Sequence, residues 1–182
     1  MAETIRKLPR TLVAHELAHG FAYRQASGSA IKILNRGTHC LCVEPADYEP
    51  ESDLHSTSAT LAGPCCDFYL QYSAMPRSAD ELLQAPNLRH SASDLKALSD
   101  MPLARLEAAM PDARAAVKTM ADFVGNHSGM LARIHDALLF GIGAGVIVDP
   151  VSLGITPLID MGKLGLSESE LAQVEALQET IN

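Results

Sequence analysis

The sequence predicts a mainly α-helical domain with a small β element. Hydrophobic residues make up 47% of the 182 residues, which is enough for a buried core, whereas aromatic residues make up only 4% and Trp is absent. The core is therefore expected to be aliphatic, and segments rich in Ala and Leu favour helices. The length suits one compact domain, with a motif-bearing core over residues 10–140 and a C-terminal apolar segment and helix over 141–182.

The helices are predicted from apolar residues that recur at intervals of three or four. The first helix covers residues 10–25 and the second about 56–73. The stretch SASDLKALSD reads as the start of another helix. Residues 103–140 carry a long helical pattern, in which Pro111 is expected to begin a new helix and GNHSG weakens the middle.

The β element is predicted from a short apolar run at Ile31–Leu34, which ends before Gly37. The start of the following stretch, THCLCVEPADYEPESD, is expected to extend into a second strand, and its remainder reads as an acidic solvent loop. The Gly-rich apolar segment 141–165 reads mostly as loop. The stretch LSESELAQVEALQE predicts a last helix, with Ser167 and Glu170 forming a capping box.

The charge balance excludes several kinds of partner. There are 22 acidic and 14 basic residues, a formal net charge of -8, and no basic stripe of the kind that nucleic-acid binding requires. The start of the chain lacks the apolar run of a signal peptide. The longest apolar run has about half of the roughly 20 residues that a membrane-spanning helix needs. We therefore expect a cytoplasmic protein that binds no nucleic acid and does not insert into membranes.

The four cysteines are expected to be free thiols with packing roles. Cys40 with Cys42 and Cys65 with Cys66 have C-x-C and C-C spacings, which differ from the C-x2-C pairs of structural zinc sites. A second metal site that uses these thiols, together with His39, is the alternative.

The motif that carries chemistry is His15-Glu16-Leu17-Ala18-His19, an H-E-x-x-H pattern on the first predicted helix. Two His residues four positions apart point from one face of a helix, so both can hold one Zn²⁺ at about 2.0–2.1 Å. Glu16 is not a ligand in this pattern but lies beside the open coordination position, where it can take a proton from zinc-bound water. The motif therefore predicts a zinc-dependent hydrolase with Glu16 as the catalytic base.

A zinc site of this kind needs a third protein ligand. The extended form H-E-x-x-H-x-x-G-x-x-H does not continue here, because Gln25 lies where the third His would be. The remaining candidates are carboxylates further along the chain, and their spacing does not choose among them: Asp67, Asp94, Glu44, Glu49 and Glu51.

Four segments in the same order resemble the peptidase domain of the FtsH-type, AAA-linked zinc metalloproteases. HELAHGF is similar to that family's H-E-A-G-H-A, and IKILNRG to its strand ending in I-P-R-G. LAGPCCDFYL is similar to its L-x-G-x-x-A-E helix, and SASDLKAL to its G-A-S-x-D-[LI] segment. These segments span residues 12–98, with a looser similarity to about residue 140, and the first and fourth motifs are the specific ones.

The resemblance implies that Asp94 is the third zinc ligand, because it falls on the Asp of the fourth motif. It places Asp67 where the family has Glu, in a position that supports a zinc-binding His. The resemblance also implies that the strand at Ile31–Leu34 holds a substrate peptide by strand pairing. The chain departs from the family in carrying no P-loop and no membrane-spanning segment.

Two functional hypotheses follow. The first is an ATP-independent zinc endopeptidase that hydrolyses peptide bonds in unfolded or flexible protein substrates. The second is a non-proteolytic metal-binding regulatory or interaction module derived from such a peptidase, which docks on a partner ATPase. The apolar segment 141–159 is a candidate surface for homo-oligomer formation, and the alternative is that this segment packs on its own core.

Overall fold

The computed structural model describes residues 8–36, 39–45, 53–140 and 143–159, and it is mainly helical with a four-stranded antiparallel sheet. The predicted fold class is confirmed at this level. The elements in chain order are α1 (Arg10–Ser27), β1 (Ile31–Asn35), β2 (Cys40–Val43), α2 (Asp53–Tyr72), α3 (Ala79–Gln84), α4 (Ala92–Ser99), α5 (Leu103–Asn126), α6 (Met130–Phe140), β3 (Gly143–Asp149) and β4 (Gly154–Ile159).

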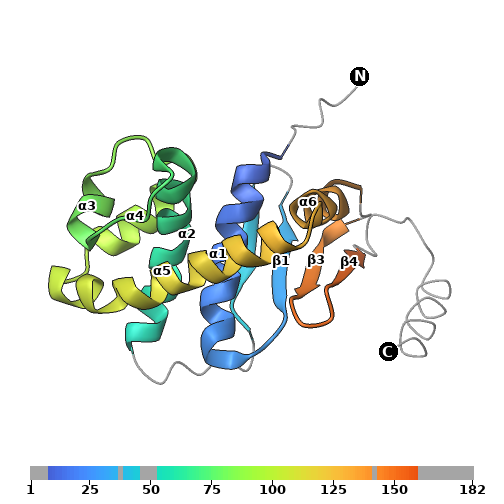
Figure 1. Cartoon of the computed structure of the whole chain (residues 1–182), viewed down its shortest axis with the longest axis horizontal. Helices are drawn as coiled ribbons and strands as arrows, with labels where there is room; N and C mark the ends of the chain where they lie inside the picture. Colours follow the sequence, from blue (N-terminus) through green and yellow to red (C-terminus); the bar gives the residue numbers. More distant parts are fainter. Residues whose placement is uncertain (1–7, 37–38, 46–52, 141–142, 160–182) are drawn as a thin grey trace.

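Helix α1 forms the centre of the domain. Figure 1 shows α2, α3 and α4 on one side of α1 and the sheet on the other, with α5 crossing the front of the helices. Every residue of α1 from Val13 to Ala22 is buried. Because this stretch is surrounded, its residues outside the H-E-x-x-H motif are all small or apolar.

Small residues let the neighbouring elements approach α1 closely. A Cβ atom on Gly20 would come within 3.1 Å of Ile31 Cγ1 and closer still to Ile31 Cγ2, so glycine is required where α1 packs on the start of β1. The core around this contact is aliphatic, as the composition predicted. Its largest buried side chains include Leu17, Leu61 and Leu106.

The sheet has the strand order β2-β1-β3-β4, and every neighbouring pair is antiparallel. β1 pairs with both β2 and β3, so its two edges are occupied. This corrects the expectation that the strand at Ile31–Leu34 holds a peptide, because an interior strand has no free edge. β2 and β4 are the edge strands among the described strands, and β2 is the one that lines the cleft described below.

Two predictions of secondary structure are wrong. Segment 141–165 is not mostly loop, because β3 and β4 form a hairpin within it and Val146 and Val148 are buried in the core. β-branched residues fit a pleated, half-buried surface, and this preference outweighs the glycines. Pro111 does not begin a helix, because α5 continues through it. Pro111 is exposed, so the carbonyl that loses its backbone partner can be solvated.

Other predictions are confirmed or fall on parts of the chain that are not described. The strand in THCLC forms β2, the stretch SASDLKALSD contains α4, and the helical pattern of 103–140 breaks at 127–129 between α5 and α6. The predicted last helix and residues 46–52 of the acidic loop lie outside the described residues.

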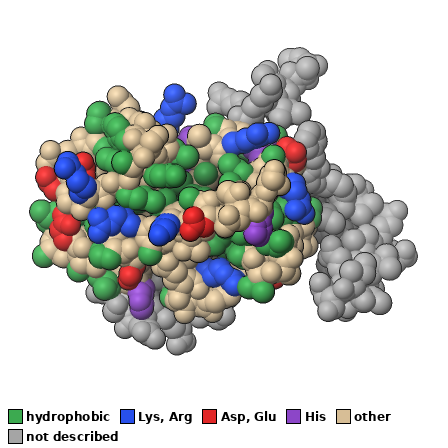
Figure 2. All heavy atoms as spheres, in the orientation of Figure 1, with side chains coloured by type: hydrophobic (Ala, Val, Ile, Leu, Met, Phe, Trp, Pro, Cys, Tyr) green, Lys and Arg blue, Asp and Glu red, His purple; other side chains and the backbone are tan. Residues whose placement is uncertain are grey.

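Among the described helices, none has both the length and the apolar character needed to cross a membrane. Basic and acidic side chains are interspersed on the face shown in Figure 2.

Candidate metal centre

Three side chains from two helices converge on one point beside α2. His15 and His19 lie one turn apart on α1 and are buried, and Asp94 lies in the first turn of α4. The two Nε2 atoms are 3.1 Å apart, and Asp94 Oδ2 lies 3.1 Å from His15 Nε2 and 3.4 Å from His19 Nε2. Ligand atoms about 2.05 Å from a tetrahedral zinc are about 3.3 Å from one another. The three observed separations match that geometry.

The contacts at the two Nδ1 atoms turn both Nε2 atoms toward each other and toward Asp94. His19 Nδ1 donates to the Ala59 carbonyl oxygen at 2.7 Å, which fixes the tautomer with a lone pair on Nε2. His15 Nδ1 is buried and lies 3.2 Å from Asp67 Oδ2, an ion-pair distance without the alignment of a hydrogen bond. With Nδ1 protonated on both rings, two nitrogen lone pairs and a carboxylate oxygen face one another, and this donor set suits Zn²⁺.

The electrostatics of the centre favour a positive charge. Burial lowers the pKa of His15, but the carboxylates of Asp67 and Asp94 outweigh burial and raise it to about 9. Burial raises the pKa of Asp94, but His15 and His19 bring it well below its usual range. In the metal-free protein, a proton on His15 places a positive charge next to the carboxylates of Asp67 and Asp94. A divalent cation can take the place of this proton.

Asp67 connects three elements behind His15. Its Oδ2 atom accepts hydrogen bonds from Ser91 Oγ at 2.7 Å and from the His90 backbone N–H at 2.9 Å, in addition to the contact with His15. Burial raises the pKa of Asp67, but the contacts with His15 and Ser91 lower it below its usual value. Asp67 therefore stays outside the group of three and holds His15 of α1 against the segment that carries Asp94.

Gly63 of α2 packs directly on the two imidazoles. A Cβ atom at this position would lie 2.6 Å from His15 Nε2 and closer still to His19 Nε2. The backbone of α2 thus forms one wall of the space into which the lone pairs point. The next residue, Pro64, lies inside the helix and removes one backbone hydrogen bond from the same turn.

Glu16 lies beside the three ligands and points toward β2. Its Oε2 atom accepts a hydrogen bond from the Cys42 backbone N–H at 2.6 Å, and the side chain is buried. Burial raises the pKa of Glu16 above its usual value, although the nearby His19 and the Cys42 N–H oppose the shift. A carboxylate whose pKa is raised toward neutral is a stronger base than an exposed one.

A cleft of about 470 Å³ opens over the centre. α1 lines it with the motif residues and with Leu12 and Tyr23, whereas β2 lines it with Cys40, Leu41 and Cys42. The remaining lining residues come from the loop before β2, from α2 and from the segment at α4: His39, Thr60, His90, Ser93 and Asp94. A molecule that lies along β2 can therefore reach the converging atoms of His15, His19 and Asp94.

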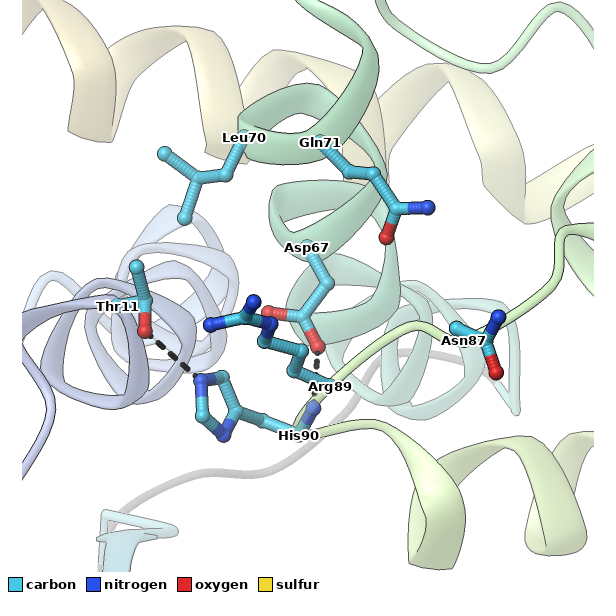
Figure 3. A pocket seen from close by; sticks show the side chains of 7 residues that line it. All are labelled: Thr11, Asp67, Leu70, Gln71, Asn87, Arg89 and His90. Carbon is cyan, nitrogen blue, oxygen red and sulfur yellow. Dashed lines mark hydrogen bonds between the residues drawn. The ribbon is translucent and has the colours of Figure 1, made fainter.

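A second pocket of about 370 Å³ lies behind His90 (Figure 3). It shares His90 with the cleft and contains Asp67, and its other lining residues are Thr11, Leu70, Gln71, Asn87 and Arg89. Within it, His90 Nε2 lies 2.9 Å from Thr11 Oγ1. The imidazole of His90 thus separates the two spaces.

Of the sequence-predicted residues, the structure brings together His15, Glu16, His19 and Asp94, with Asp67 behind them. Glu44 is exposed and does not belong to the group, and Glu49 and Glu51 lie outside the described residues. Within the described part of the chain, the four cysteines are buried free thiols and do not belong to the metal group. Burial raises the pKa values of the thiols, to about 12 for Cys40 and Cys65, and makes them unreactive at neutral pH.

Sequence reasoning missed three contributors to the site: the Ala59 carbonyl, Gly63 and His90. Ala59, Gly63 and Asp67 are spaced by four residues, so they form one stripe on α2, and this spacing was a usable signal. For His90 no spacing pattern pointed to the site.

Comparisons of the chain with protein-family models, with curated proteins and with solved structures gave no match. The resemblance to the FtsH-type peptidases therefore rests on the four sequence motifs.

Proposed function

We propose that the protein is a zinc-dependent endopeptidase with an FtsH-peptidase-like fold, in which His15, His19 and Asp94 hold the metal. The observation that carries this proposal is the set of ligand-atom separations, 3.1, 3.1 and 3.4 Å, with the carboxylate of Glu16 beside them in the same cleft. A bound Zn²⁺ supplies Lewis-acid chemistry, because it acidifies water and polarises a carbonyl group.

Glu16 acts as general base and then as general acid. It accepts the proton of the water that attacks the scissile carbonyl carbon, and it passes this proton to the amide nitrogen as the C–N bond breaks. The Cys42 N–H fixes the carboxylate on the β2 side of the cleft. Asp67 and the Ala59 carbonyl hold the two imidazoles in one tautomer while this proton moves.

The edge of β2 that pairs with no other described strand supports an extended peptide as the substrate. Arg36 N–H donates to His39 O at 2.9 Å, which marks this pair as hydrogen-bonded across the two strands. Backbone groups alternate in direction along an antiparallel strand, so those of Cys40 and Cys42 point away from β1. The Cys42 N–H is the group that reaches Glu16, as this alternation requires. A substrate strand paired at Cys40 passes the metal ligands, and only an unfolded or flexible segment can adopt that form.

The test compares purified, zinc-loaded wild type with Glu16→Gln on casein and on a peptide library. Wild type is expected to cleave and Glu16→Gln to lose turnover while retaining about one zinc per chain, because Glu16 is not a ligand. Glu81→Gln is the matched control, since Glu81 pairs with Arg77 on the surface. Equal products, or equal absence of products, from wild type and Glu16→Gln would contradict the peptidase assignment.

A further inference from the structure

His90 stands in the cleft without a role in the mechanism above. It is half-buried, and its ring packs edge-on against that of His15, with centroids 6.0 Å apart and planes at 73°. Glu16 is bonded to β2, whereas His90 immediately precedes α4, and both line the cleft over His15, His19 and Asp94. A reacting carbonyl bound in this cleft can meet the base from the β2 wall and His90 from the wall that leads into α4.

Three contacts fix the position of His90. Its backbone N–H donates to Asp67 Oδ2 at 2.9 Å, the neighbouring Ser91 hydroxyl donates to the same atom, and its Nε2 atom lies 2.9 Å from Thr11 Oγ1. In Figure 3 the Nε2 atom points at Thr11, and the second ring nitrogen lies on the other side of the ring, away from Asp67. Such support is what a preorganised donor needs.

The second ring nitrogen, Nδ1, makes no hydrogen bond to any residue that the structure describes. A hydroxyl can donate as well as accept, so Thr11 can give its hydrogen to Nε2. A neutral imidazole that accepts at Nε2 carries its own hydrogen on Nδ1. His90 then presents an N–H donor at the wall of the cleft.

We propose that His90 is a catalytic residue whose Nδ1–H donates a hydrogen bond to the oxyanion formed from the scissile carbonyl, an inference that rests on the proposed peptidase function. Water oxygen bonds to the carbonyl carbon, its proton passes to Glu16, and the carbonyl π electrons move onto oxygen, where His90 stabilises them. The C–N bond then breaks, the electron pair returns to form the carbonyl, and Glu16 gives the proton to the leaving nitrogen. His90 donates throughout and exchanges no proton.

Two variants separate the donor from the bulk of the side chain. His90→Leu removes the donor and keeps similar volume, whereas His90→Asn places an amide N–H near the position of Nδ1. We expect His90→Leu to lower kcat by about 10²- to 10³-fold, as loss of one oxyanion donor does elsewhere, with KM and zinc content unchanged. His90→Asn should recover most of the loss. His127→Leu, at the α5–α6 junction, serves as the histidine control.

A binding measurement provides a readout that does not depend on turnover. A phosphinic peptide carries a tetrahedral anionic group, so its affinity for the zinc-loaded protein should fall in His90→Leu by the same factor as kcat/KM. The affinity for a product peptide should not change. Thr11→Val, which removes the hydroxyl partner of Nε2, should produce a smaller loss in the same direction.

The other outcomes overturn the assignment in distinguishable ways. If His90→Leu loses zinc together with activity, His90 supports His15 and does not act on the oxyanion. If His90→Leu retains wild-type kcat while Glu16→Gln is inactive, the His90 assignment fails and the peptidase function stands. If wild type itself shows no turnover beyond Glu16→Gln, the peptidase function fails and the His90 assignment fails with it.

Discussion

Replacing Gly63 by Ala tests the geometry of the metal centre with a single methyl group. The added Cβ would lie 2.6 Å from His15 Nε2 and closer to His19 Nε2. Ordinary contacts of carbon with other heavy atoms begin at about 3.5 Å. The imidazoles or α2 must therefore move by about 1 Å, and both elements are buried and fixed by other contacts.

A displacement of this size is larger than a zinc site tolerates. Metal–ligand distances are held to within about 0.2 Å. Loss of a single outer-shell partner typically weakens metal binding by about 10- to 100-fold, and Gly63→Ala moves two ligands at once. We therefore expect zinc affinity to fall by at least about 100-fold, or the site to be lost.

The assay is competition for zinc against a chromophoric chelator, with stability followed by thermal unfolding. Gly125→Ala is the matched control, because Gly125 lies in α5 and a Cβ there would meet nothing within 4 Å. That variant should bind zinc as wild type does and should be slightly more stable, since Ala favours helices. If Gly63→Ala binds zinc within a few-fold of wild type, the deduced packing of α2 on the imidazoles is wrong.

The remaining predictions concern the ligands, the proton that competes with the metal, and stability. Asp94→Asn should lose zinc, whereas Asp100→Asn at the exposed end of α4 should retain about one zinc per chain by elemental analysis; full zinc in the first variant would remove Asp94 from the ligand set. Asp67→Asn should weaken zinc binding by about 10- to 100-fold and leave one zinc per chain at saturation, and unchanged affinity would refute its role behind His15. Because the pKa of His15 is raised to about 9, zinc must displace a proton below that pH. Zinc affinity measured by calorimetry should therefore rise by about tenfold per pH unit toward pH 9. The released proton should make the observed binding enthalpy depend on the ionisation enthalpy of the buffer. An affinity that does not change with pH would show that His15 is not a ligand. Zinc at about 100 times its Kd should stabilise the fold by about 2.7 kcal/mol, and a chelator should reverse the rise in Tm; an unchanged Tm would contradict binding to the folded state.

The sequence predicted the local parts of this protein well. The helix that carries the motif, the strand at Ile31–Leu34 and the position of His15 and His19 on one face of the helix all follow from short-range periodicity, which depends on only a few neighbouring residues. The choice of Asp94 as third ligand came from the resemblance, because spacing left five carboxylates equal. In the structure, Asp67 of α2 contacts both Ser91 and His15, and these long-range contacts bring the start of α4, with Asp94, to α1.

The errors share a physical cause. The β3–β4 hairpin was not predicted because its pairing with β1 joins residues more than a hundred positions apart. The glycines of this segment also favoured a loop, although Val146 and Val148 are buried. Pro111 was taken as a boundary because its propensity is strongly unfavourable inside a helix. The buried residues on both sides of it, Met110 and Ala113, keep α5 continuous. In both cases tertiary packing outweighed a local preference.

The stripe on α2 explains how one helix can shape the proposed metal centre without giving it a ligand. Ala59, Gly63 and Asp67 recur every four residues, as do His15 and His19 on α1, so two rows of the same spacing face each other. Each member of the α2 row acts on an imidazole differently. The Ala59 carbonyl fixes the tautomer of His19, and Gly63 leaves room for both rings. The Asp67 carboxylate raises the pKa of His15. A shift of α2 along its axis by one residue would break all three contacts together. The register of α2 against α1, to which buried residues beside the stripe such as Leu61 and Ala62 contribute, therefore fixes the orientation of the proposed metal ligands.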